Sequence, residues 1–207
     1  MSSDKSHWET IYSTKSAEKR SWTQTRPEIA LSWIHKAAPA RNSRIIDVGA
    51  GASNLVDALL DDGYTELTVL DLSRAALDEA KARVGTRAAG VKWIEADVTE
   101  FKPDGTYDVW HDRAVFHFLT RIEDRRKYVA TLAQALLPGG HAIIGTFALD
   151  GPEKCSGLEV VRYDEKKLAA ELGTQFTLVY SLSNIHTTPW ESKQSFLFCL
   201  FERLKTR

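Results

Sequence analysis

Two glycines separated by one residue follow a β-branched run and precede a helix-like segment. The stretch covers residues 45–55 and reads IIDVGAGASNL, with Gly49 and Gly51 in the turn. A β-branched apolar run predicts a buried strand, and glycines directly after it predict a sharp turn that approaches a ligand closely. Because such a turn offers backbone N–H groups at the amino end of a helix, it suits a nucleotide-like ligand.

An acidic residue follows this turn at the distance used for ribose recognition. Asp71 ends the next strand-like run, about 20 residues after the glycines. A carboxylate there can accept both hydrogens of a ribose diol. Asn54 stands where the dinucleotide fingerprint has its third glycine, which argues against a nicotinamide cofactor. The spacing therefore predicts an adenosine-type cofactor, and the alternative is a plain turn followed by a solvated aspartate.

A second polar group follows the strand-like run YDVWH. It comprises His111, Asp112, Arg113 and His117. A helix beginning near Arg113 would put Arg113 and His117 on one face, where they could clamp an anion or position a base. The alternative is a charged surface helix, or a core histidine hydrogen-bonded to the backbone.

Three further residues fall in segments expected to face a substrate. They are Arg162, Tyr163 and His186. An arginine at position 162 suits a carboxylate-bearing substrate. His186 lies in the polar connection NIHTTPWESKQ, which could equally be an ordinary loop. The histidines offer no ligand pair backed by a carboxylate, so no metal site is predicted.

Alternating strand and helix patterns must position these residues. Strands are expected at 44–48, 67–71, 91–95, 107–111 and 141–147, and helices at 27–36, 53–60, 73–84, about 124–137 and 164–172, with Ser53 and Ser73 as caps. The runs FTLVYSLS and SFLFCLFER should pair antiparallel, because their connection is too short for a helical crossover. The pattern predicts an α/β fold with a Rossmann-like, doubly wound seven-stranded sheet, mostly parallel with an antiparallel C-terminal strand.

Composition limits the classes of function. A chain of 207 residues, 43% of them apolar, can bury one core, so a single domain with small appendages is expected. A net charge of −1 gives no broad attraction for nucleic acid or anionic membranes. Cys155 and Cys199 match no metal or disulfide spacing, and no segment approaches the ~18 apolar residues of a membrane span. We expect a cytoplasmic protein without nucleic-acid or membrane partners.

The order and spacing of several motifs resemble those of class I S-adenosylmethionine-dependent methyltransferases. The resemblance covers residues 44–202 and rests on IDVGAGASNL, VLDLS, WIEADV, YDVWHDRAVFHFL, LLPGGHAII and the terminal hairpin. It implies S-adenosyl-L-methionine as cofactor, S-adenosyl-L-homocysteine as product, and transfer by in-line displacement without a metal. The residues that it implies for cofactor binding are Asp47, Gly49, Ala50, Gly51, Asn54, Asp71, Leu72, Asp97, Val98 and Asp112.

The family pattern also implies a role for each acidic residue. Asp71 matches the ribose-binding position and Asp97 the position that contacts the adenine amine. Asp112 matches the segment that lines the amino-acid end of the cofactor. Asp47 matches the acidic residue before the glycine turn, which engages the cofactor's ammonium directly or through water.

The N-terminal segment HWETIY…SWTQTRPE adds a finer resemblance. Thiopurine and tellurite methyltransferases and small protein-lysine methyltransferases use such a segment as a lid. The resemblance implies a lid and helix over residues 1–36, a cofactor domain over 37–207, and Trp8, Tyr12 and Trp22 facing the cofactor. The aromatic faces could attract a sulfonium cation and exclude water, or could simply anchor a helix on the sheet.

Methyl transfer to the nitrogen, oxygen or sulfur of a small molecule is the expected function, with Arg113 and His117 acting on the acceptor. Protein-lysine methylation is the first alternative. The acidic-Lys-Gly-Thr signature of the lysine enzymes is replaced here by Asp112-Arg113-Ala114-Val115. The same architecture also suits a nicotinamide-dependent oxidoreductase or a non-catalytic cofactor-binding protein.

Overall fold

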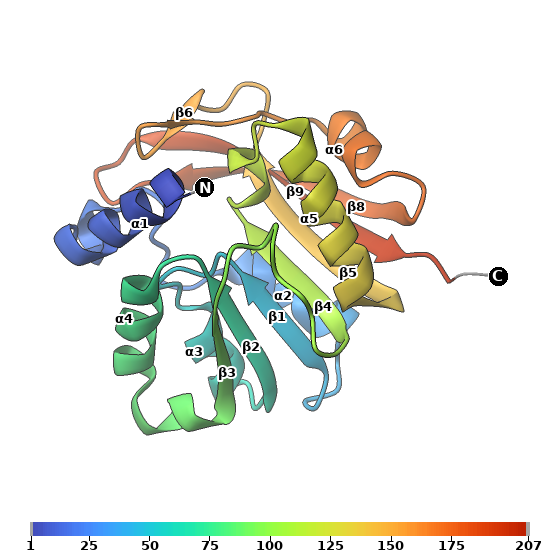
Figure 1. Cartoon of the computed structure of the whole chain (residues 1–207), viewed down its shortest axis with the longest axis horizontal. Helices are drawn as coiled ribbons and strands as arrows, with labels where there is room; N and C mark the ends of the chain where they lie inside the picture. Colours follow the sequence, from blue (N-terminus) through green and yellow to red (C-terminus); the bar gives the residue numbers. More distant parts are fainter. Residues whose placement is uncertain (1, 206–207) are drawn as a thin grey trace.

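A seven-stranded sheet forms the centre of the computed structural model, which describes residues 2–205 (Figure 1). The strands lie in the order β3-β2-β1-β4-β5-β9-β8. Their bounds are β1 Arg44–Val48, β2 Glu66–Asp71, β3 Val91–Glu95, β4 Tyr107–Arg113, β5 Leu136–Phe147, β8 Phe176–Thr187 and β9 Lys193–Arg203. Pairing is parallel from β3 to β5, and β9 is antiparallel to both β5 and β8. The predicted fold class is confirmed.

Helices cover both faces of the sheet (Figure 1). Their bounds are α1 Ser2–Thr14, α2 Glu28–Ala37, α3 Leu55–Asp61, α4 Arg74–Val84, α5 Ile122–Ala135 and α6 Glu165–Leu172. The connections contain three short 3-10 helices, η1 Ala17–Lys19, η2 Gly85–Gly90 and η3 Phe116–Phe118. They also contain a small antiparallel hairpin of β6 Lys154–Cys155 and β7 Leu158–Glu159. Helices α2 and α3 lie behind the sheet in Figure 1, whereas α5 and α6 lie in front, and α1 lies against α4.

Strand alternation divides the apolar side chains between two cores. Ile45 belongs to the core under α2 and α3, with Leu31 and Leu55, whereas the next residue, Ile46, belongs to the core under α5 and α6, with Tyr128. Successive side chains of a strand point to opposite faces, so a shift of one residue would exchange the two sets. The packing therefore fixes which residues of each strand reach each face.

The strand order reverses between β1 and β4. On one side the chain proceeds from β1 to β2 and β3, and on the other from β4 to β5. The loops that leave the carboxyl ends of β1 and β4 consequently diverge, which opens a crevice at that edge. The glycine turn follows β1, and Asp71 ends β2. His111 and Arg113 lie within the last three residues of β4. The predicted functional segments thus converge on one edge of the sheet.

Three predicted elements are wrong in detail. No helix begins near Arg113, because β4 continues to Arg113 and Ala114 then takes a positive φ of 72°. Asn54, not Ser53, is the N-cap residue of α3, and the Ser53 hydroxyl accepts a bond from Leu55 N at 3.1 Å. Strands β8 and β9 extend into the predicted polar connection, so His186 lies in β8, paired with Gln194.

The cap of α4 is as predicted, since the Ser73 hydroxyl accepts a bond from Ala76 N. The division of the chain after residue 36 stays a prediction. Helix α2 extends across it and packs Leu31 and Ile34 into the core. Within residues 2–205, no helix has both the length and the apolar character needed to cross a membrane.

Candidate active site

Asp71 holds the glycine turn and the start of α4 together. Its Oδ2 accepts a hydrogen bond from Gly51 N at 2.7 Å, and its Oδ1 accepts one from Ser73 N at 2.8 Å. Burial raises the pKa of Asp71 to about 6, and these two bonds oppose the shift. A carboxylate has about four acceptor positions, so two backbone bonds leave capacity for the hydroxyl groups of a ligand.

Asp47 and His111 form a buried pair on β1 and β4. The two residues are register partners in the sheet, and His111 Nδ1 lies 2.6 Å from Asp47 Oδ1. The distance indicates that Nδ1–H donates to the carboxylate, which leaves the lone pair on Nε2. Among the described residues, neither Asp47 Oδ2 nor His111 Nε2 has a hydrogen-bond partner. Buried groups of this kind call for a ligand or an ordered water.

An aromatic cover lies over this edge of the sheet. The rings of Trp8 and Trp22 lie 5.7 Å apart, Tyr12 lies within 6.4 Å of both, and Phe118 lies 5.2 Å from Trp8. A Cβ built on Gly51 would lie 2.0 Å from the Tyr12 hydroxyl. Gly51 therefore has no space for a side chain because the cover lies directly on the turn.

Two arginines behind the cover differ in their partners. Arg20 is 4% exposed, makes bonds of 2.9 and 2.6 Å to both oxygens of Glu79, and lies 4.5 Å from the Tyr12 ring. Arg113 donates from Nη1 to Trp22 O at 2.8 Å. Its Nε and Nη2 are buried and have no partner among the described residues. Burial lowers the pKa of Arg113 to about 10, so the guanidinium stays charged at neutral pH.

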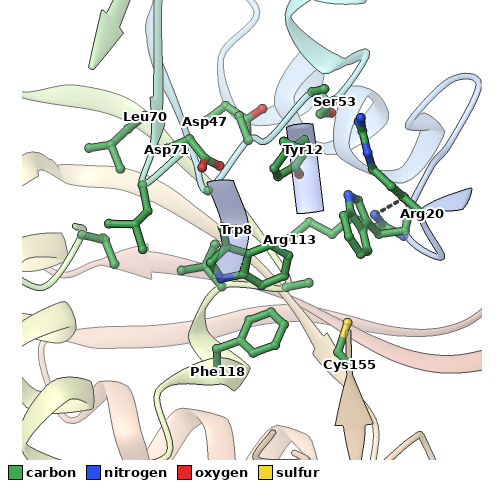
Figure 2. A pocket seen from close by; sticks show the side chains of 18 of the residues that line it. Trp8, Tyr12, Arg20, Asp47, Ser53, Leu70, Asp71, Arg113, Phe118 and Cys155 are labelled. Carbon is green, nitrogen blue, oxygen red and sulfur yellow. Dashed lines mark hydrogen bonds between the residues drawn. The ribbon is translucent and has the colours of Figure 1, made fainter. Parts of the chain in front are cut away.

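These residues enclose a cavity of about 720 Å³ at the carboxyl edge of β1, β2 and β4. Figure 2 shows Asp47 and Asp71 on one side of it and Phe118 and Cys155 on the other, with Trp8, Tyr12, Arg20 and Arg113 between them. The volume falls within the ~300–1,000 Å³ range of small-molecule sites. The cavity combines fixed carboxylates, one unpaired guanidinium and apolar ring faces, so it can bind a ligand that carries both polar and apolar groups.

Known proteins are similar to this chain in sequence. Residues 45–140 match the family described as "Methyltransferase domain". Over this segment the chain belongs to the methyltransferase domain family. It is 26% identical over 108 residues to the eEF1A lysine and N-terminal methyltransferase of Mus musculus, covering 52% of this chain and 15% of the relative. It is 28% identical over 120 residues to the ubiquinone biosynthesis O-methyltransferase of Aromatoleum aromaticum, covering 57% and 50%.

Solved structures support the fold of the methyltransferase domain. The N-methyltransferase NodS from Bradyrhizobium japonicum, solved in complex with S-adenosyl-L-homocysteine, superposes with a TM-score of 0.71 at 17% identity, over 96% of this chain and 100% of that one. The curated relatives are longer, and the chain spans about half of their length or less. The family match removes the basis for the nicotinamide alternative.

Most residues expected to hold the cofactor line the cavity of the methyltransferase domain. They are Trp8, Tyr12, Trp22, Asp47, Gly49, Ala50, Asn54, Asp71, Leu72, Asp97 and Val98. Gly51 lies beneath the Tyr12 hydroxyl. Asn54 also fastens the cover, because its amide donates to the carbonyl oxygens of Gln24 and Thr25. These residues form one side of the cavity, and the role of each in cofactor binding stays a proposal.

Asp112 and His117 do not line the cavity. The Asp112 carboxylate faces the opposite core, where it accepts bonds from Val115 N, Phe116 N and the Tyr128 hydroxyl. The His117 ring is fully buried between Phe118 and Phe147, and burial lowers its pKa to about 3. The expected roles, cofactor contact for Asp112 and base for His117, do not fit these positions, because both side chains are used in packing the domain.

The three expected substrate residues also lie outside the cavity lining. Arg162 pairs with Glu153, and Tyr163 is fully buried against Phe116. His186 lies in β8 with its Nε2 2.6 Å from Ser21 O, so it holds the N-terminal segment. All three were expected on substrate-side loops, but the structure uses them in contacts within the protein.

The sequence grouped His111 with Arg113 without indicating a role for it, and it left several other lining residues unmarked. His111, Arg20, Phe118 and Cys155 all line the cavity. The signal for His111 was present, because it precedes Arg113 by two residues and therefore shares its face of an extended strand. Nothing local marked Arg20 or Cys155, which reach the cavity only through tertiary packing. Burial raises the pKa of the Cys155 thiol to about 11, which disfavours the nucleophilic thiolate.

Proposed function

We propose that the protein transfers a methyl group from S-adenosylmethionine to a small-molecule acceptor. The observation that carries the proposal is the cavity in which the glycine turn, Asp71 and Asp97 lie together at the reversal of the strand order. When bound, S-adenosylmethionine supplies a methyl group on a positively charged sulfur, which a nucleophile displaces in line. The protein's main task is then to align the reactants.

The residues present fit this cofactor. Asp71 is fixed by two backbone bonds, and its remaining lone pairs can accept the ribose hydroxyls. Asp47 Oδ2 is a buried acceptor without a partner among the described residues, which suits an ammonium group. Asp97 Oδ1 is held by Thr99 N at 2.8 Å, and its other oxygen is available to the adenine amine. The donor and acceptor set therefore matches the three polar parts of the cofactor.

The aromatic cover supports the same proposal. Trp8, Tyr12 and Trp22 present ring faces at the cavity, and an aromatic face attracts a cation within about 6 Å. Their packing also excludes water from the place where a charged sulfur would react. Since these rings come from the N-terminal segment, we infer that this segment serves as the lid.

A protein lysine is the second candidate acceptor. The relative that methylates lysine in eEF1A favours it. Against it stand the cover of residues 8–22 over the cavity and the sequence Asp112-Arg113-Ala114-Val115 at the end of β4. The aromatic cover over the cavity supports a small molecule as the first candidate.

Binding and turnover should be tested in that order. Calorimetry should detect S-adenosylhomocysteine binding to the wild type and to Asp61→Asn, a matched change on an exposed residue that pairs with Arg87. Asp71→Asn should weaken the binding by about 1–3 kcal/mol, because a buried carboxylate acceptor is lost. A panel of thiols, amines, phenols and carboxylates, with a lysine peptide alongside, should then reveal product formation. Absence of binding would contradict the proposal, and binding without transfer to any member would favour a non-catalytic protein.

A further inference from the structure

We propose that the acceptor is an aromatic carboxylate, held at two points by Arg113 and His111. Its carboxylate pairs with the guanidinium of Arg113, and an amine or hydroxyl group next to the carboxylate donates to His111 Nε2. The inference rests on the proposed function and specifies the acceptor class at the same cavity.

Arg113 is a charged group without a counter-ion. Its Nε and Nη2 are buried and unpartnered among the described residues, and no carboxylate there forms an ion pair with it. The other cavity arginine, Arg20, has both its outer nitrogens bonded to Glu79. Burying a cation without a partner is costly, and the free edge of a guanidinium matches a carboxylate in two parallel bonds. The contrast singles out Arg113 as the position for an anionic ligand.

His111 supplies the second point. Its Nδ1 is committed to Asp47 Oδ1 at 2.6 Å, so Nε2 is left as an acceptor without a partner among the described residues. His111 and Arg113 are two residues apart on β4, and both line the cavity. Their side chains therefore leave the same face of the strand, about 7 Å apart at the backbone. That spacing suits one small molecule whose donor group lies next to its carboxylate.

The walls near Arg113 favour an aromatic body. The Phe196 ring, 4.9 Å from the guanidinium, supports it from the core outside the cavity lining, and the guanidinium donates a hydrogen bond to the carbonyl oxygen of Trp22, which lines the cavity. Trp8 and Phe118 form the adjacent wall (Figure 2). Offset and edge-to-face contacts with these rings would orient a planar ligand.

His111 and Asp47 can also take up the proton that the nucleophile loses. As the nucleophile forms its bond to the methyl carbon, the carbon–sulfur bond breaks and its electron pair stays on the sulfur. The amine or hydroxyl proton passes to His111 Nε2. Asp47 stabilises the resulting imidazolium through Nδ1, and water later removes the proton. No oxidant or metal enters this balance.

Equilibrium binding tests the anion point. With S-adenosylhomocysteine at saturation, benzoate should bind about tenfold or more tighter than its neutral analogue benzamide. Arg113→Gln should remove this preference, whereas Arg87→Gln, which alters an exposed arginine outside the cavity lining, should retain it. Arg113→Lys keeps the charge and should keep part of the preference, which covers the case in which the glutamine variant does not fold. Equal binding of benzoate and benzamide, or binding of neither, would overturn the inference.

The proposed hydrogen bond from the ligand to His111 Nε2 needs a second pair of probes. The wild type should bind 2-aminobenzoate tighter than benzoate, and His111→Phe should lose that gain. His35→Phe is the matched control, because His35 forms a similar pair with Asp62 outside the cavity lining. If His111→Phe does not fold, Asp47→Asn tests the same point, since it weakens the contact that directs Nε2. An unchanged gain in the folded variants would overturn this part of the inference.

The cofactor supplies the remaining control. If Arg113 held the cofactor's own carboxylate, Arg113→Gln would weaken S-adenosylhomocysteine but not 5′-methylthioadenosine, which lacks the amino-acid part. We expect both to bind to the variant as to the wild type, and selective loss of S-adenosylhomocysteine would overturn the inference. Failure of S-adenosylhomocysteine to bind to the wild type would instead contradict the proposed function itself.

Discussion

The ribose contact proposed for Asp71 requires an ionised carboxylate, yet burial raises the pKa of Asp71 to about 6. Cofactor affinity should therefore fall as the pH decreases through about 6, because a protonated carboxyl has fewer acceptor positions. Calorimetry of S-adenosylhomocysteine between pH 8 and 5 checks this, and Asp71→Asn should show the weaker affinity without the pH step. Asp112 also has a pKa raised to about 6, but it lies outside the cavity lining, so the variant assigns the step to Asp71. A flat wild-type profile would speak against the ribose contact.

Alanine variants at Gly51 and Gly85 allow the effect of backbone strain to be separated from that of a steric clash. Both have a positive φ, +57° and +67°, but a Cβ on Gly51 would meet the Tyr12 hydroxyl at 2.0 Å, whereas one on Gly85 would meet nothing within 4 Å. Replacement by alanine should strain the backbone at both sites, by roughly 1–3 kcal/mol each. Only Gly51→Ala should also displace Tyr12 and weaken S-adenosylhomocysteine, as measured by urea unfolding and calorimetry. Equal affinity of the two variants would show that Tyr12 can move without consequence.

At the scale of the element, α1 is attached to the fold through the amino end of α4. The Glu9 carboxylate accepts bonds from Arg74 N at 2.6 Å and Ala75 N at 3.2 Å, where the helix dipole also favours a negative charge. Glu9→Ala should loosen α1, speed amide exchange of residues 8–14 and weaken cofactor binding. Glu18→Ala, on an exposed residue of the same segment, is the control. Unchanged exchange would mean that ring packing alone holds α1.

The same segment should respond to ligand. Its rings gain contacts when the cavity is filled, so S-adenosylhomocysteine should slow amide exchange over residues 8–22. Helix α6, which packs on the opposite face with α5, gives the internal reference. Equal protection of residues 8–22 with and without ligand would make the segment a fixed part of the fold and not a lid.

At the scale of the whole molecule, His117 makes the free energy of unfolding depend on pH. Its pKa is lowered to about 3 in the folded state, compared with about 6.5 for an unperturbed histidine. Between these values the unfolded chain binds a proton that the folded chain does not, so stability decreases as the pH falls. Asp71 and Asp112, whose pKa values are raised, act in the opposite direction between about pH 4 and 6.

His117→Phe should therefore lose less stability than the wild type between pH 7.5 and 4.5, measured by urea unfolding. Its affinity for S-adenosylhomocysteine at pH 7.5 should be unchanged, because the ring does not line the cavity. His141→Phe, also outside the cavity lining, is the control for replacing a histidine by an aromatic ring. A large loss of cofactor affinity in folded His117→Phe would return His117 to the site.

Local sequence indicated the sheet, the methyltransferase family and the residues on the glycine-turn side of the cavity. A strand's alternation, the glycines after β1 and the aspartate at the end of β2 are patterns within a few residues or at a fixed spacing, so they survive without knowledge of the tertiary structure. They predicted the seven strands and the position of Asp71. The resemblance of the N-terminal segment likewise directed attention to Trp8, Tyr12 and Trp22.

Only the tertiary structure decided which side chains of β4 line the cavity together. Arg113 pairs with Gly145 of β5, which extends β4 and replaces the expected helical spacing of four by the extended spacing of two. Arg113 therefore shares a strand face with His111 and lines the cavity with it, whereas His117 does not line the cavity and Asp112 turns to the opposite core. Arg20 is held at the cavity by hydrogen bonds to Glu79, 59 residues away in the chain. Such contacts depend on which strands pair and how segments pack, and no local pattern of residues encodes that choice.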